Sequence, residues 1–132
     1  MGENADVLRS GYEAFARGDM DGVKELWADD IRWEGPNAEQ LPGGGTRSGK
    51  DDVAGMLGEI AERWERFDVS PDEFIEQGDT VVVLGHSEGK AKDSGAEVKV
   101  PFVHVWRMSD GKAARVQVLT DTAVVAEALG VG

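Results

Sequence analysis

The chain has 132 residues and a formal net charge of -12, with 40 % hydrophobic residues and no cysteine. This charge would repel nucleic-acid phosphates and anionic lipid headgroups, and no apolar run reaches the ~20 residues that span a bilayer, so neither nucleic acid nor a membrane is an expected partner. The length fits a single domain over residues 1–132. The absence of cysteines and of a signal-peptide pattern favours the cytoplasm.

The first half of the chain predicts three helices and one short strand. Apolar residues recur at helical spacing over 5–16, and a second, short helix follows up to Trp27. Residues 29–35 alternate between apolar and polar, which indicates a strand. Ser48 with Asp51 three residues later resembles a capping box, so a third helix is expected to run to about Trp64.

The segment 35–49 separates this strand from the third helix. It contains two prolines and five glycines and shows no periodicity, so we expect a loop. Loops of this length in a small domain are commonly lids or binding loops.

After Trp64 the hydrophobic period changes to two, which predicts a sheet. We expect four strands, over residues 67–77, 80–91, 96–108 and 113–121. A short helix or tail should follow the last strand. Pro71 indicates a bulge or an edge position in the first strand. The expected fold is α+β: three N-terminal helices packed on a strongly curved, mostly antiparallel sheet whose cone-shaped interior is the natural pocket.

The turn at 110–111 sets a register for the last two strands. Asp-Gly favours a two-residue hairpin turn, so paired residue numbers should sum to 221. The pairs that result are His104 with Gln117, Phe102 with Leu119, and Val100 with Asp121, and all six side chains would face the pocket.

A turn centred on Ser94 sets the register of the preceding hairpin. It would place His86 beside Phe102 and Glu88 beside Val100, although a slip of one residue would turn both polar side chains away from the pocket.

Asp121 and His104 are the candidate catalytic residues. An apolar face behind Asp121 would raise the pKa of its carboxyl toward the range of a general base, but the same carboxylate would also suit an N-cap of the terminal helix. His104 could donate to an oxyanion or orient Asp121, with Gln117 as its partner, or it could be a hydrogen-bonded core residue.

Further side chains would line the pocket or, for the aromatic ones, fill the core. They are Tyr12, Phe15, Trp33, Met56, Trp64, His86, Phe102, Trp106, Gln117 and Leu119. The two histidines lack the spacing of a metal site, so no metal and no cofactor are expected.

Several segments together resemble the SnoaL-like proteins of the nuclear transport factor 2-like superfamily, which also contains the ketosteroid isomerases. These segments are YEAFARGDMDGVKELWADDIRWEGP, SGKDDVAGML, FVHVWRMSDGKAARVQVLTDTA and the closing EAL. The resemblance implies a cone-shaped α+β barrel, often a homodimer through the outer sheet face, with an apolar pocket for a small organic molecule. Asp121 matches the aspartate that acts as general base in the polyketide cyclases of this family.

The sequence departs from the ketosteroid isomerase pattern at the positions that carry that chemistry. Gly35 stands where those enzymes have their aspartate base, Gly11 where they have the oxyanion tyrosine, and His104, or Val103 in an ungapped alignment, where they have a protonated aspartate. Steroid isomerisation by the same residues is therefore not expected.

These observations leave three hypotheses. The first is cofactor-free proton transfer, cyclase- or isomerase-like, on a small and mostly apolar carbonyl compound, with Asp121 as base and His104 at the oxyanion. The second is binding of a small hydrophobic molecule without chemistry. The third is a dimeric interaction domain whose pocket has collapsed.

Overall fold

The computed structural model describes residues 2–131. Its elements in chain order are α1 Glu3–Ala16, α2 Met20–Glu25, β1 Trp27–Glu34, β2 Thr46–Ser48, α3 Lys50–Arg63, β3 Trp64–Gln77, β4 Thr80–Ala91, β5 Glu97–Ser109, β6 Lys112–Thr120 and α4 Thr122–Leu129. The strands form one sheet in the order β2-β1-β6-β5-β4-β3, in which only the β1–β6 pair is parallel.

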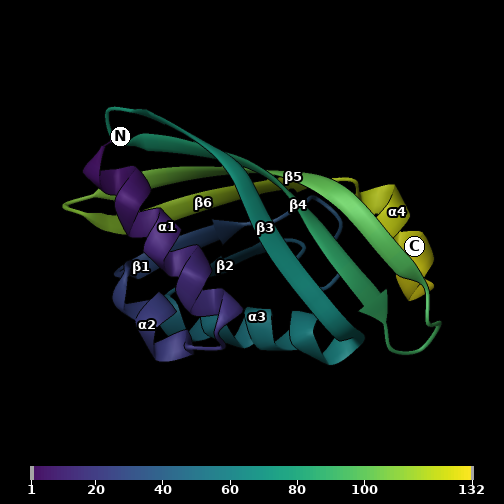
Figure 1. The fold of residues 1–132 in the computed structure, drawn as a ribbon. Helices are drawn as coiled ribbons and strands as arrows, with labels where there is room; N and C mark the ends of the chain where they lie inside the picture. The colour runs from purple at the N-terminus through teal and green to yellow at the C-terminus, as the bar shows by residue number, and fades with distance from the viewer. Residues whose placement is uncertain (1, 132) are drawn as a thin grey trace.

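The sheet curves around the first three helices, and α4 lies at the end of the molecule opposite the N-terminus (Figure 1). Burial alternates along β4, so Val81 and Val83 face the helices whereas Val82 and Leu84 face outward. The expected α+β fold with helices on one face of a strongly curved, mostly antiparallel sheet is confirmed.

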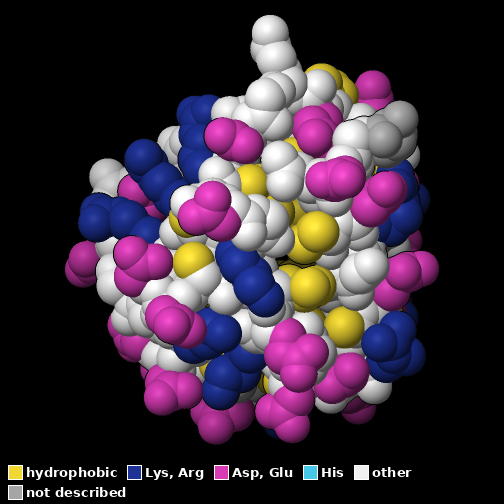
Figure 2. Space-filling model, turned by 90° about the vertical axis from the view of Figure 1, so that its left-hand side faces the viewer, with side chains coloured by type: hydrophobic (Ala, Val, Ile, Leu, Met, Phe, Trp, Pro, Cys, Tyr) yellow, Lys and Arg dark blue, Asp and Glu magenta, His cyan; other side chains and the backbone are white. Residues whose placement is uncertain are grey.

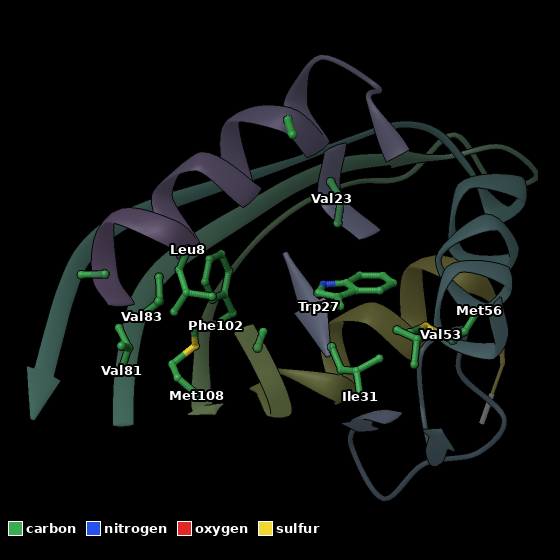
Figure 3. Packing of buried hydrophobic residues seen from close by; sticks show 13 residues of the cluster. Leu8, Val23, Trp27, Ile31, Val53, Met56, Val81, Val83, Phe102 and Met108 are labelled. Atoms are coloured by element: carbon green, nitrogen blue, oxygen red, sulfur yellow. The ribbon is translucent and has the colours of Figure 1, made fainter. Parts of the chain in front are cut away.

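Two groups of buried side chains hold the helices to the inner sheet face (Figure 3). Leu8 of α1 packs with side chains of the long strands, including Phe102 and Met108. Where α3 meets β1 the second group consists of Trp27, Ile31, Val53 and Met56. Each side chain of this size contributes roughly 1.5–3 kcal/mol when fully buried, so these contacts fix where the helices sit over the sheet.

Most element predictions agree with the structure, and the differences have local causes. A bulge lies between Pro71 and Glu73 of the edge strand β3, as the proline indicates. β3 already begins at Trp64, and the expected loop 35–49 contains β2, which pairs with β1. The N-cap of α3 is Gly49, at φ 90°, and not Ser48.

The register predicted for β5 and β6 is wrong beyond the two residue pairs next to the turn. Ser109 pairs with Lys112 and Met108 with Ala113, as expected, but Arg107 pairs with Arg115. This bulge leaves Ala114 unpaired and shifts the rest of β6 by one residue, which turns every later side chain to the opposite face.

The register predicted for β4 and β5 is also wrong by one residue. Phe102 pairs with Gly85, and His86 pairs with Pro101. The amide of Ala91 donates to the carbonyl of Ala96, so this pair encloses a loop of four residues, 92–95. Ser87, and not His86 or Glu88, therefore faces the helices.

On the face shown in Figure 2, acidic and basic side chains surround a narrow hollow with hydrophobic side chains at its centre. Among residues 2–131 no helix is long and apolar enough to cross a membrane.

Candidate functional site

A cavity of about 550 Å³ lies between the helices and the inner sheet face. Its volume falls within the range of small-molecule sites. Its wall is mostly apolar, and it includes Leu8, Phe15, Met20, Val23, Trp33, Leu41, Leu57, Ile60, Trp64, Phe67, Val69, Val100, Phe102, Trp106, Val118 and Val125.

The mouth of the cavity lies where α3 ends and β3 begins. The exposed residues of the lining are concentrated there, at Gly58, Ala61, Glu65 and Arg66. Glu65 and Arg66 are the only lining residues in the described chain whose side chains are charged at neutral pH. No carboxylate from the described residues therefore lies deep in the cavity.

The loop between β1 and β2 forms a fixed part of the wall. The Trp33 indole N–H donates to the Gly43 carbonyl at 2.8 Å, and the Gly35 amide donates to the Gly45 carbonyl at 2.8 Å. Gly35 has no room for a side chain, because a Cβ there would lie 1.9 Å from the Gly43 oxygen. These contacts hold Leu41, which is buried, against the cavity.

Three polar side chains form a hydrogen-bonded chain at the α1 side of the cavity. The Trp106 indole N–H lies 3.0 Å from the Tyr12 hydroxyl, which lies 2.6 Å from His104 Nδ1. Because the indole can only donate, the tyrosine oxygen accepts from Trp106 and its own proton is free for His104. We assign the Tyr12 proton to this bond, which makes Nδ1 its acceptor and leaves the imidazole proton on Nε2.

Burial keeps both titratable members of this chain neutral. Desolvation lowers the pKa of His104 from 6.5 to about 3. Desolvation also raises the pKa of Tyr12 well above its usual value, although the hydrogen bond from Trp106 acts in the opposite direction. At neutral pH His104 is thus an uncharged hydrogen-bond donor and a poor general base.

The proton on His104 Nε2 faces the cavity. This nitrogen has no hydrogen-bond partner among the described residues. In that part of the chain, every side-chain nitrogen or oxygen that is fully enclosed by protein does have a partner. Nε2 must therefore be open to the cavity that His104 lines. The imidazole ring is held in place by stacking on Phe102, with the ring centroids 4.0 Å apart.

The structure brings seven of the predicted site residues to the cavity. They are Tyr12, Phe15, Trp33, Trp64, Phe102, His104 and Trp106. Met56 belongs instead to the fully buried core beneath α3 and does not line the cavity.

Asp121 does not face the cavity, which corrects the predicted orientation. The β6 bulge turns it away from the inner sheet face, and it is exposed at the start of α4. Its carboxylate accepts a hydrogen bond from the Val124 amide at 3.3 Å, so it is the N-cap of that helix.

The two register errors also misplace three other predicted pocket residues, Gln117, Leu119 and His86. Gln117 and Leu119 are exposed on the outer face, and Leu119 keeps 50 % of its surface accessible. His86 lies on the outer face as well, with Nδ1 2.9 Å from an Asp72 carboxylate oxygen.

Ser87, Val118 and Thr120 line the cavity but were missed. The hydrophobic pattern held the signal for β6, because Val116 and Val118 alternate with Arg115 and Gln117. That pattern places the valines inside, against the register counted from the turn.

The comparisons with known proteins agree with this architecture. The model of the SnoaL-like domain family matches residues 8–116. The chain belongs to the SnoaL-like family. The comparison with curated proteins gives no match.

Solved structures extend the likeness over nearly the whole SnoaL-like chain. An NTF2-like protein of unknown function from Burkholderia pseudomallei is 35 % identical, with 98 % of both chains covered and a TM-score of 0.90. TerC, co-crystallised with polyporic acid, is 30 % identical over 98 % of this chain and 99 % of its own, with a TM-score of 0.88. A SnoaL-like polyketide cyclase from Jannaschia sp. CCS1 is 19 % identical over 98 % and 93 %, with a TM-score of 0.85, and shows the fold alone.

Proposed function

We propose that this SnoaL-like protein binds a small, uncharged and mostly apolar ring compound in the cavity, and that a carbonyl oxygen of this compound accepts a hydrogen bond from His104 Nε2. The observation that carries the proposal is an unpartnered donor, facing an apolar cavity of about 550 Å³ from a rigid aromatic wall. A buried donor without a partner costs about 1–3 kcal/mol, which a ligand oxygen would offset.

The charges around the cavity support an uncharged ligand. His104 and Tyr12 are neutral, and Glu65 and Arg66 at the mouth each lie within ion-pair distance of other side chains. An anion deep in the cavity would meet no opposite charge from the described residues. TerC, which is 30 % identical, was co-crystallised with polyporic acid, which supports a small-molecule ligand for this cavity.

Catalysis by proton transfer with Asp121 as base is not part of this proposal. Its carboxylate is exposed and caps α4, and the buried His104 is too weak a base to replace it. Of the three hypotheses, binding of a small molecule without chemistry is the one that the geometry favours.

The test compares 2-acetylnaphthalene with 2-isopropenylnaphthalene, which has nearly the same shape but no oxygen. Both should quench the fluorescence of the tryptophans that line the cavity, and the ketone should bind about threefold to tenfold more tightly, as one hydrogen bond predicts. His104→Phe keeps an aromatic ring but no donor, so it should remove this preference.

His86→Phe is the matched control, because His86 is the other histidine and lies on the outer face. This variant should bind both compounds as the wild type does. The proposal fails if neither compound binds, and the role of His104 fails if His104→Phe still prefers the ketone.

We also propose that two copies associate through the outer face of the sheet. Half-buried aliphatic side chains from neighbouring strands adjoin there, namely Val82, Leu84, Val103 and Val105, together with the exposed Leu119.

A further inference from the structure

Ser87 of β4 is a second polar group of the cavity wall for which the cavity offers no partner. Only 7 % of its surface is accessible, and it lines the cavity. Its hydroxyl makes no hydrogen bond to any described residue, although every fully enclosed side-chain oxygen there has one. The Ser87 hydroxyl therefore opens onto the cavity.

The other hydroxyls of the wall already donate their protons. Tyr12 donates to His104, and Thr120 donates to the Pro101 carbonyl at 2.9 Å. Among the described lining residues, Ser87 thus carries the one hydroxyl left free to donate to a ligand. The other side-chain donors without a hydrogen-bond partner there are His104 Nε2, the indole N–H groups of Trp27 and Trp64, and the Arg66 guanidinium at the mouth.

The strand register fixes the separation of Ser87 and His104. His104 pairs with Val83, and Ser87 lies four residues further along β4 on the same inner face. Four residues of a strand span roughly 13 Å, so the groups lie toward opposite ends of one wall of the cavity.

The wall between them is apolar and has no side chain on its middle position. Gly85 lies between Val83 and Ser87 on the inner face, and a Cβ there would meet the Phe102 ring at 2.5 Å. The Phe102 ring occupies that space and stacks on His104. Beyond Ser87, a Cβ at Gly89 would meet the Trp64 ring at 2.9 Å. The wall therefore offers aromatic surface between its two polar groups.

We propose that Ser87 determines specificity by binding a second oxygen, at the far end of an elongated ring compound whose carbonyl oxygen is bound by His104. The inference rests on the proposed function and narrows its ligand class. The ligand is uncharged, contains at least two linked or fused rings, and carries an oxygen at each end. A compound with one polar end would leave the Ser87 hydroxyl facing apolar surface, at the cost of its lost hydration.

The test uses two probes of matched shape, 4-acetyl-4′-hydroxybiphenyl and 4-acetyl-4′-methylbiphenyl, with dissociation constants measured by calorimetry. In the wild type the hydroxyl compound should bind about threefold to tenfold more tightly, the effect of one hydrogen bond. In Ser87→Ala the order should reverse, because the methyl group then gains more from apolar burial than the hydroxyl group, which has lost its partner. Ser109→Ala, which removes an exposed hydroxyl at the end of β5, should leave the wild-type order unchanged.

The outcomes separate the inference from the proposed function. If both probes bind but the wild type prefers the methyl compound, or if Ser87→Ala keeps the wild-type preference, Ser87 has no such role while the proposed function stands. If neither biphenyl probe binds, the inference fails, and binding of the naphthalene pair decides separately whether the proposed function stands. The comparison of the two probes in the wild type alone is decisive even where the Ser87→Ala variant does not fold.

Discussion

His104 shows how its surroundings set the chemistry of a residue. The sequence identifies it as a polar residue on an inward strand face, but it leaves open whether the imidazole is a base, a donor or a core residue. Burial and the Tyr12 hydroxyl decide this, because the first keeps the ring neutral and the second occupies Nδ1. The partner expected across the strands, Gln117, is on the other face.

The lowered pKa of His104 predicts a loss of stability in mild acid. Its folded-state pKa, about 3, lies below the ordinary 6.5 of the unfolded chain, so between these values the unfolded state binds the extra proton and stability falls as pH falls. From pH 7 to pH 5 this one group should cost about 2 kcal/mol.

Urea unfolding at both pH values measures the effect. His104→Gln cannot titrate, so its free energy of unfolding should fall less than that of the wild type over the same interval. Equal losses in the two proteins would show that His104 does not stay neutral on folding.

At the scale of elements, the periodicity predicted the helices and strands but counting from the turns misassigned the sheet faces. One unpaired residue, Ala114, reversed the expected faces of Gln117 and Asp121. A four-residue loop in place of a turn centred on Ser94 did the same for His86. Turn counting carries every local irregularity along the strand, whereas the alternation of valines with polar residues reports burial directly.

The position of Asp121 predicts that it stabilises α4. Asp121→Ala removes the acceptor for the Val124 amide and should lower the free energy of unfolding by about 0.5–2 kcal/mol, and Asp121→Asn by less, since asparagine also caps helices. Neither variant should change the binding of the acetyl probes. If a variant kept its stability but no longer bound the acetyl probes, the result would instead show that Asp121 contributes to ligand binding.

At the scale of the whole molecule, the fold could be predicted because three amphipathic helices and a long period-two region admit few arrangements. The parallel pairing of β1 with β6 could not be predicted in this way, because it joins strands that are far apart in the sequence. The cavity depends on the same long-range packing. The aromatic residues that line it have the same pattern as core residues, and only the structure separates Trp33 from Met56.

The apolar outer face predicts a homodimer. Light scattering after gel filtration should give twice the chain mass of 14.2 kDa for the wild type. Leu119→Lys adds a charge within this group of aliphatic side chains and should yield monomers, whereas Val124→Lys, at an exposed apolar position of α4, should not. A monomeric wild type would refute the association.

The central claim is that His104 offers an Nε2 proton to a ligand oxygen inside the cavity. Nitrogen-15 NMR of the histidine rings, with and without 4-acetyl-4′-hydroxybiphenyl, tests it most directly. At neutral pH the account predicts that His104 carries its proton on Nε2, and that the probe shifts this N–H signal while Nδ1 stays unprotonated. A proton on Nδ1, or an Nε2–H signal that bound ligand leaves unmoved, would contradict it.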